Sequence, residues 1–457
     1  MAATDHPAGK PTPSTPAQIP RAQAFKFWLK LGFISFGGPA GQIAIMHQEL
    51  VERRRWISER RFLHALNYTM LLPGPEAQQL ATYLGWLMHG TFGGIVAGSL
   101  FVLPSFILLV LLAWVYLAFG DLPAVAGVLY GIKPAVTAIV LFAAYRIGSR
   151  ALGNPVLWAV AALAFIGIFA FRLPFPYIII GAAAIGFIGG RLAPERFTAG
   201  NSEAPDALGT SGDALIGDNT PPPPHAAPKR HKLLAILATA AALWVVGMLI
   251  LGIFLGAESP PSEMAWFFSK AALVTFGGAY AVLPYVFQGA VEAQGWLTPS
   301  QMIDGLALGE TTPGPLIMVV TFIGFVGGWT KAFLGPDALF VAGVLGAASA
   351  TFFTFLPSFL FILAGGPLVE ATRDDIKLTA PLTAITAAVV GVILNLALFF
   401  AYHVLWPQGF AGSFDGISAM IGIVCFIALA RYGANVMLLI LGSAALGFAT
   451  QALPAFV

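Results

Sequence analysis

The chain has 457 residues, of which 58% are hydrophobic and only 10% are charged, with a formal net charge of +2 and one cysteine. Soluble domains carry about a quarter charged residues, and many apolar runs here exceed the ~20 residues that a helix needs to cross hydrocarbon. The composition therefore excludes a soluble protein and indicates a polytopic membrane protein. The small net charge disfavours a nucleic-acid partner, and the single Cys425 with scattered histidines predicts neither a metal site nor a cofactor.

Along the chain, polar and apolar stretches alternate in a simple order. The sequence predicts a disordered N-terminal tail (1–24), a first membrane repeat (25–191), a flexible linker (192–231), a connecting transmembrane helix (232–256) and a second membrane repeat (257–457). The linker contains the proline run Pro221 to Pro224, which is typical of an extended, unfolded connection.

The two membrane regions are copies of each other. A shift of 240 positions places Phe36-Gly37-Gly38 on Phe276-Gly277-Gly278 and Pro73-Gly74-Pro75 on Pro313-Gly314-Pro315. Over residues 25–75, 13 of 51 positions are identical, against about four by chance for ordinary composition. Farther along, Leu103 to Phe106 matches Leu356 to Phe359. Internal duplication is typical of secondary transporters.

The segments 25–50 and 62–88 carry helix-breaking clusters at their middle, as do 264–290 and 301–328. Non-helical backbone survives at membrane depth only where protein or a cavity covers it. We therefore expect two re-entrant helical hairpins per repeat, with about four spanning helices each. The full expectation is an all-α polytopic membrane protein with two inverted-topology repeats and an extra helix joining them.

The basic residues support this orientation. If the hairpins return to their starting side, most of the 23 lysines and arginines fall on one side, including the cluster from Arg53 to Arg61 and the linker, which are then cytoplasmic. The matching loop 291–301 has no basic residue, which favours opposite orientations for the two repeats. The alternative is that every hairpin is an ordinary kinked span.

Broken helices suggest an anion site. The start of a helix arm in mid-membrane offers backbone N–H groups and the positive end of the helix dipole. The residues that we expect at these arm ends are Gly37, Gly38, Pro39, Pro73, Gly74, Pro75, Gly277, Gly278, Pro313, Gly314 and Pro315. The alternative is that these clusters are tight turns that only pack against neighbouring helices.

Polar residues follow directly on the first Pro-Gly-Pro. Glu76 is a candidate carrier of a coupling proton or a cap of its own arm, and Gln78 and Gln79 are candidate hydrogen-bond donors to an oxyanion. The second repeat has apolar residues here, so the polar chemistry is asymmetric. Glu310, just before the second Pro-Gly-Pro, partly compensates.

Four basic residues are electrostatic candidates. Lys30 and Lys270 each lie six residues before a Phe-Gly-Gly cluster and either balance an anion or extend to the membrane interface. Lys133 precedes Pro134 in an apolar stretch and is a candidate to line the transport path. Arg53 opens the cluster that either attracts anions or anchors the topology.

These motifs together resemble the chromate ion transporter family in its long, two-domain form. The resemblance rests on the two Phe-Gly-Gly clusters, Glu52 to Trp56, the run from Leu72 to Gly85, and Gly295-Trp296-Leu297 with Thr312 to Pro315. It implies a multi-pass protein of the bacterial inner membrane that exports chromate, with sulfate as a competing oxyanion. The second repeat departs from the pattern, because Ala279 stands where the first has Pro39.

The predicted function is a secondary active transporter, not an enzyme. Chromate is the expected substrate on the resemblance alone, and the alternatives are a sulfate or other oxyanion carrier and, from another class, an intramembrane enzyme. The lipid bilayer is the expected environment. The sequence does not determine the oligomeric state and leaves a homodimer open.

Overall fold

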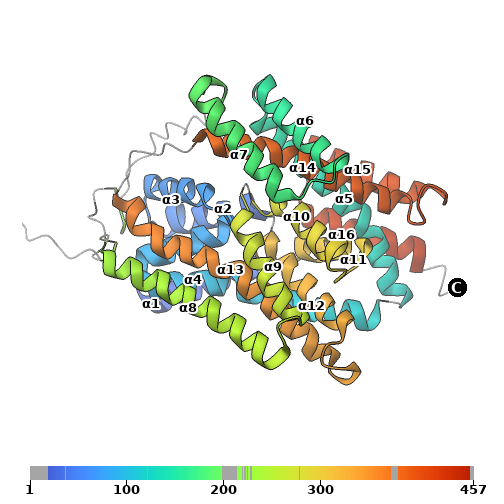
Figure 1. The fold of residues 1–457 in the computed structure, drawn as a ribbon, viewed down its shortest axis with the longest axis horizontal. Helices are drawn as coiled ribbons and strands as arrows, with labels where there is room; N and C mark the ends of the chain where they lie inside the picture. Colours follow the sequence, from blue (N-terminus) through green and yellow to red (C-terminus); the bar gives the residue numbers. More distant parts are fainter. Residues whose placement is uncertain are drawn as a thin grey trace, which may run out of the picture.

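The computed structural model describes residues 19–452 apart from 37, 121, 198–213, 219, 221–222, 224, 227–228, 277 and 372–378. Within these residues the chain is helical, and the one extended pairing is an isolated parallel bridge between Ile57 and Ile216. Figure 1 shows the helices packed as one elongated bundle. The prediction of an all-α polytopic membrane protein is confirmed.

The first half contains seven helices. They are α1 (Arg21–Ile34), α2 (Gly38–His47) with a π-helical turn η1 (Gln48–Arg53), α3 (Glu59–Leu71), α4 (Glu76–Phe119), α5 (Pro123–Ala151), α6 (Pro155–Phe169) and α7 (Phe175–Leu192). Helix α4 is interrupted at His89 and Gly90, whose φ angles of −137° and +68° leave the helical region. Residues 21–24 were predicted to belong to a disordered tail, and that boundary is wrong because α1 already begins at Arg21.

Helix α8 (Arg230–Leu255) precedes the second half. The second half contains α9 (Pro260–Val274), α10 (Ala279–Phe287) with η3 (Gln288–Ala293), α11 (Pro299–Thr311), η4 (Leu316–Met318), α12 (Val319–Lys331), α13 (Leu339–Ala371), α14 (Thr379–Leu405), α15 (Gly416–Tyr432) and α16 (Val436–Gly447). Short turns η2 (Pro194–Arg196), η5 (Pro336–Ala338) and η6 (Phe448–Ala452) complete the elements.

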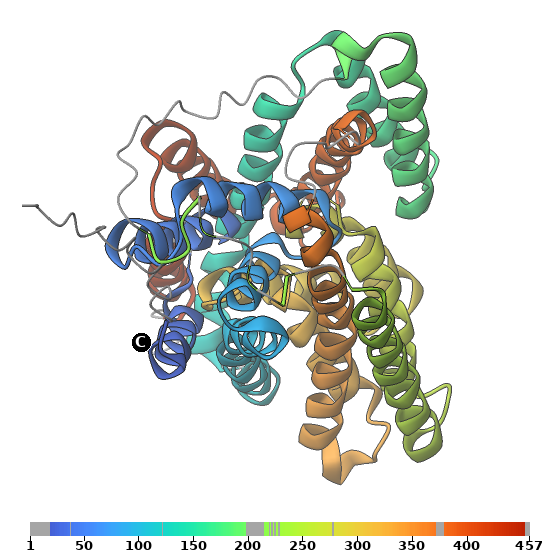
Figure 2. The same ribbon diagram turned by 90° about the vertical axis from the view of Figure 1, so that its left-hand side faces the viewer.

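Six of these helices are long and apolar enough to cross a membrane. The described spans are Glu76–Phe119, Pro123–Ala151, Phe175–Leu192, Arg230–Leu255, Pro336–Pro367 and Ala380–Leu405, and shorter apolar helices accompany them. Helix α8 has no buried residue, and Figure 2 shows it along the outside of the bundle. Hydrocarbon is the natural surrounding for such a helix, because it is apolar on every side.

The local structure repeats with the spacing of the sequence duplication. Helices α3 and α11 start and end 240 residues apart, as do the π-helical turns η1 and η3. The glycines of the breaks adopt the same unusual backbone, with φ of +69° at Gly38 and +88° at Gly278, and of +126° at Gly74 and +112° at Gly314. Side chains with a Cβ rarely adopt these angles, which explains why both copies carry glycine there. Helix α10 starts one residue later than the equivalent of Gly38, where α2 starts, and ends at the equivalent position, although Ala279 replaces proline.

Several ends of the first-half segments lie close together. His89, at the end of the first arm of α4, lies 2.8 Å from the carbonyl oxygen of Ile19 at the start of α1. Arg54, after α2, stacks over the ring of Phe27 in α1 at 5.3 Å. The linker joins the same end, because His225 contacts the carbonyl oxygen of Trp86 at 2.8 Å.

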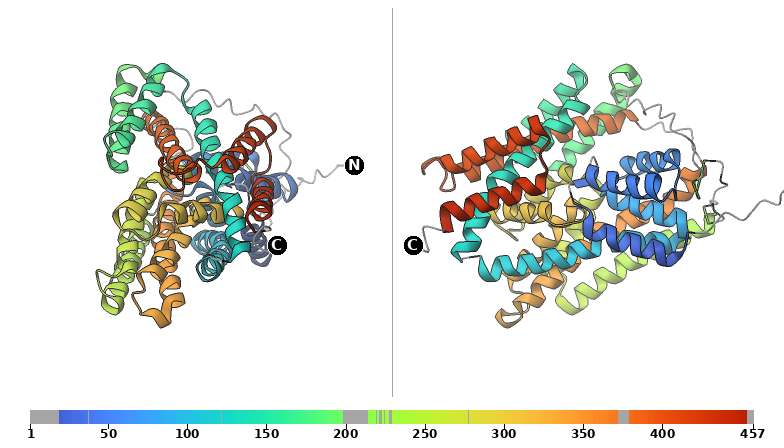
Figure 3. Two further views of the ribbon diagram at one scale, coloured as in Figure 1. Left: turned by 90° about the vertical axis from the view of Figure 1, so that its right-hand side faces the viewer. Right: turned by 180° about the vertical axis from the view of Figure 1, so that it is seen from behind.

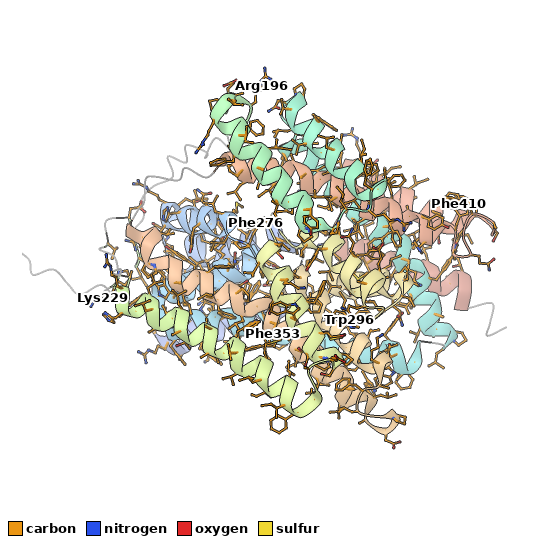
Figure 4. All side chains as sticks on the ribbon, viewed as in Figure 1. Arg196, Lys229, Phe276, Trp296, Phe353 and Phe410 are labelled. Atoms are coloured by element: carbon orange, nitrogen blue, oxygen red, sulfur yellow. The ribbon has the colours of Figure 1, made fainter. Side chains whose placement is uncertain are left out.

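The second-half hairpins gather at the other end of the long helices. Trp296 lies against Phe267 in the middle of α9, with ring centroids 5.6 Å apart. Helix α13 starts beside the end of α12 and runs the length of the bundle to Glu370, whose carboxylate accepts a 2.6 Å hydrogen bond from Tyr83. The right-hand view of Figure 3 shows the first-half hairpins in blue at one end, away from the C-terminus. Figure 4 places Lys229 and Phe410 at opposite ends, with Phe276 between them.

The described part of the linker is bound to the first half rather than extended from it. Leu215 and Ile216 pair with the backbone of Arg55 and Trp56 at 3.0 and 2.9 Å. Ser58 donates a 2.5 Å hydrogen bond to Asp218. The flexible-linker prediction therefore fails for this stretch, because its backbone groups find partners on the loop between α2 and α3. Residues 198–213 lie outside the described part.

Candidate functional site

The helix breaks of the two halves are paired across the molecule. The N–H of Gly74 donates a 2.7 Å hydrogen bond to the carbonyl oxygen of Thr275, and the N–H of Gly314 donates a 2.8 Å hydrogen bond to that of Ser35. Each Pro-Gly-Pro break thus meets the Phe-Gly-Gly region of the other half. A buried backbone donor without a partner costs several kcal/mol in hydrocarbon, so each half satisfies the broken backbone of the other.

Two equivalent serines lie against these glycines. A Cβ on Gly74 would lie 2.6 Å from the Ser358 Oγ, and a Cβ on Gly314 would lie 3.0 Å from the Ser105 Oγ. Both serines are at most 1% exposed, and neither hydroxyl has a hydrogen-bond partner among the described residues. A buried hydroxyl left unpaired is costly, so these two groups are suited to a polar guest.

Three glutamines surround the place where Gly74 meets Thr275 and Gly314 meets Ser35, which we call the crossing. Gln42 donates a 2.5 Å hydrogen bond to the carbonyl oxygen of Gly314 and a 3.2 Å bond to that of Ser35. Gln79 donates to the carbonyl oxygen of Pro73 at 2.7 Å, and Gln78 donates to the Thr82 hydroxyl at 3.0 Å. All three are fully buried, and each keeps one amide oxygen without a described partner.

The two predicted carboxylates lie at different breaks. Glu76 starts α4, and its Oε1 lies 3.6 Å from where a Cβ on Gly278 would be. No hydrogen bond or ion pair joins it to another described residue. Glu310 is buried at the end of α11 and accepts a short hydrogen bond from the Tyr280 hydroxyl. Glu76 is thus the carboxylate left available at the crossing.

Three arm starts lack a side-chain cap. Pro75, Gly278 and Pro315 precede α4, α10 and η4, and none of them has a side chain that accepts a hydrogen bond from the first turn. By contrast, Ser58 and Thr298 cap α3 and α11. Uncapped first-turn amides and the helix dipole favour an anion. The N–H groups of Gly74 and Gly314 are not available to it, because the other half already binds them.

The structure does not bring every predicted residue to this crossing. Lys30 is exposed on α1, and the Lys270 Nζ lies over the ring of Trp266 at 5.5 Å. Arg53 pairs with Glu49 at 2.8 Å on the surface. Gly37 and Gly277 lie outside the described residues.

Lys133 lies away from the breaks, at the end opposite the linker. Its Nζ is 3.4 Å from the Asp304 carboxylate and donates to Ser300 at 2.7 Å. Pro39, Pro73 and Pro313 occupy the break segments or the helix starts beside them, as expected from their missing N–H.

Sequence reasoning missed Ser105, Ser358, Gln42 and Asp304. The repeated Leu-Pro-Ser-Phe motif carried a signal for the two serines, since a small polar residue recurs in an apolar run. Gln42 and Asp304 have no counterpart of the same kind in the other copy, where Val282 and His64 stand. The described residues contain no cluster of histidine, cysteine or carboxylate side chains suited to a metal ion.

Comparisons with known proteins agree with this architecture. The chain is 34% identical to the chromate transport protein of Pseudomonas aeruginosa over 84% of this chain and 81% of that protein. It is 30% identical to the probable chromate transport protein of Synechococcus elongatus over 81% of this chain and 82% of that protein. It is 29% identical to the chromate transport protein of Cupriavidus metallidurans over 83% of this chain and 82% of that protein.

These relatives are named as transport proteins and not as enzymes. No solved structure matches the chain. The chromate transporter family matches residues 22–187 and 262–448, which cover both halves and leave out the linker and α8. The chain belongs to the chromate transporter family.

Proposed function

We propose that this protein is a secondary active transporter that exports chromate across the bacterial inner membrane. The observation that supports this most is the crossing of helix breaks, where uncapped arm starts and two unpaired serine hydroxyls meet between the halves. The names of the relatives support chromate as the substrate. Backbone amides and hydroxyl groups are hydrogen-bond donors that suit a tetrahedral divalent anion.

In this proposal the first-turn amides of α4 and the hydroxyls of Ser105 and Ser358 hold the oxyanion. The crossing lies where both halves contribute, so a small movement of one half against the other exposes it to one end or the other. Inverted repeats that rock around a fixed site are a common basis of alternating access.

We also propose that the two ends of the bundle face opposite sides of the membrane. The linker and the loop from Arg53 to Arg61 are then cytoplasmic, in agreement with the positive-inside rule. The two transporting repeats are then residues 25–191 and 257–457, and α8 is the extra membrane-spanning helix between them.

A sulfate carrier that tolerates chromate is the second candidate. Chromate and sulfate share charge and tetrahedral shape, so serine hydroxyls and amides distinguish them weakly. Everted membrane vesicles given labelled chromate or labelled sulfate separate the two. Accumulation of chromate that collapses with an uncoupler is the expected result, and a clear preference for sulfate over chromate would favour the second candidate.

The site itself is tested with the variant that combines Ser105→Ala and Ser358→Ala. A hydrogen bond to a charged group contributes about 1.5–3 kcal/mol, so we expect uptake to fall about tenfold or more. Ser99→Ala and Ser349→Ala are the matched controls, because Ser99 is exposed on α4 and Ser349 bonds the carbonyl oxygen of Pro261 instead. Normal uptake by the double variant would exclude this site.

A further inference from the structure

A separate polar cavity lies at the end opposite the linker. It has a volume of about 580 Å³ and lies between the end of α4, the start of α5 and the start of α11. Tyr116, Tyr130, Lys133, Ser300 and Asp304 provide its polar wall. The cavity does not include the helix breaks, so it is distinct from the crossing described above.

The two charged side chains of this cavity, Lys133 and Asp304, differ in their contacts and in their exposure to solvent. The Lys133 Nζ lies 3.4 Å from Asp304 Oδ2 and donates a 2.7 Å hydrogen bond to Ser300. Tyr116 donates to the same Asp304 oxygen at 2.9 Å. The other oxygen, Oδ1, is buried with no partner among the described residues. The side chain of Lys133 is 27% exposed and that of Asp304 only 2%.

Because of this difference in exposure, we expect Lys133 and Asp304 to have different roles. The partly exposed ammonium group of Lys133 is open to an anion that enters the cavity. The buried carboxylate of Asp304 depends on Lys133, since removing one partner from a buried ion pair leaves the other uncompensated. An anion that binds Lys133 weakens the ion pair and therefore favours protonation of Asp304 from water. The Asp304 Oδ1, which has no partner among the described residues, can accept that proton.

Among the described residues, no other charged side chain lines the cavity. Of the described titratable groups that line the cavity, Tyr116 from α4 and Lys133 from α5 contact Asp304, whereas Tyr130 from α5 donates to both oxygens of Asp415 at 2.8 Å. Helices α12, α14 and α16 also pack against α11 but contribute no charged residue to this lining.

We propose that this cavity is a second station for a tetrahedral divalent oxyanion, bound by Lys133, and that its occupation is linked to protonation of Asp304. The proposal rests on the proposed function for the nature of the cargo. Linkage is reciprocal, so the anion favours protonation and protonation favours the anion. Loss of the proton from Asp304 then recovers Lys133 and releases the anion.

Thiol labelling of the full-length protein tests this without any transport. Ala126 lines the cavity and is exposed, so Ala126→Cys is introduced in a Cys425→Ala background, since Cys425 is the only native thiol. Two methanethiosulfonate reagents of similar size and opposite charge are compared, with sulfate as the protecting anion because chromate oxidises thiols.

We expect the negative reagent to react faster than the positive one and sulfate to slow the reaction, more strongly at lower pH. Lys133→Met should reverse the reagent preference and raise the sulfate needed for half protection about tenfold or more, as loss of one charged contact implies. Asp304→Asn, which keeps the shape but cannot take the proton, should strengthen protection and remove its pH dependence. Lys331→Met, a basic residue outside the cavity, should behave as the parent.

Absence of protection in the parent, or equal protection in Lys133→Met, would overturn the proposal. If sulfate protects Ala126→Cys but the variant with Ser105→Ala and Ser358→Ala transports normally, the central site is excluded. The proposal for this cavity is then still supported. Protection that responds to Lys133→Met but not to pH or Asp304→Asn would overturn the proton linkage.

Discussion

Gly74 and Thr275 belong to different halves of the chain, and the N–H of the first donates a 2.7 Å hydrogen bond to the carbonyl oxygen of the second. The equivalent bond joins Gly314 to Ser35 at 2.8 Å. Both bonds bridge the halves at the level of the helix breaks. A movement that separates the halves at this level would therefore break both bonds.

Gly74→Ala is expected to damage the protein at this crossing. The φ angle of +126° disfavours a Cβ, and that atom would lie 2.6 Å from the Ser358 Oγ and the Gln79 Nε2. We expect a stability loss of about 1–3 kcal/mol and at least a tenfold loss of chromate uptake. Melting in detergent and vesicle uptake measure the two effects.

Gly252→Ala is the control for this change, because nothing lies within 4 Å of its Cβ position on α8. It should leave both quantities unchanged. Wild-type melting and uptake in Gly74→Ala would contradict the role of the crossing.

Glu76→Gln is expected to abolish accumulation that depends on the proton gradient. The carboxylate lies at the crossing without a described partner, and glutamine keeps its size but cannot carry a proton. Uptake with and without an uncoupler provides the measurement, and exchange of labelled for unlabelled chromate should persist. Glu292→Gln, at an exposed position, serves as the control. Uncoupler-sensitive accumulation in Glu76→Gln would contradict a coupling role.

Glu52 and Glu292 are expected on opposite faces of the membrane. They are equivalent in the two halves and both are exposed, so Glu52→Cys and Glu292→Cys in a Cys425→Ala background are a matched pair. A membrane-impermeant thiol reagent should label Glu292→Cys in intact spheroplasts and Glu52→Cys in everted vesicles. Labelling of both variants from one face would exclude the inverted arrangement.

The binding of the linker is expected to weaken in acid. Burial lowers the pKa of His225 below its ordinary value, and the charge of Lys232 acts in the same direction. The bound state therefore prefers the neutral ring. This contribution is complete above the ordinary pKa of about 6.5 and declines as the pH falls below it.

Limited proteolysis of the linker at two pH values checks this expectation. Cleavage should rise on acidification, and His225→Gln, which keeps a donor but cannot charge, should cleave equally at both. His403→Gln should respond to pH as the parent does. Equal pH dependence in the parent and in His225→Gln would contradict the expectation.

The local breaks were predictable because their causes are local. Proline and glycine end helices wherever they stand, so Pro73-Gly74-Pro75 and its copy marked the ends of α3 and α11. Hydropathy likewise marked the long spans, and α8 begins at Arg230 rather than at the predicted residue 232.

The contacts between halves were not predictable from these patterns. Neither a hydrogen-bond partner such as Thr275 nor the exposure of Lys30 follows from the spacing of residues along one segment. The interruption of α4 at His89 and Gly90, by contrast, agrees with the predicted end of the segment 62–88. The ion pair of Lys133 with Asp304 joins two helices whose packing depends on the whole bundle.

Helix α8 is apolar on all sides and buries no side chain. Such a helix needs only sufficient length and hydrophobicity to insert into a membrane. In the mirror arrangement proposed above, this single membrane-spanning helix is what gives the second repeat the orientation opposite to the first. Many different apolar sequences of this length would serve equally well at this position.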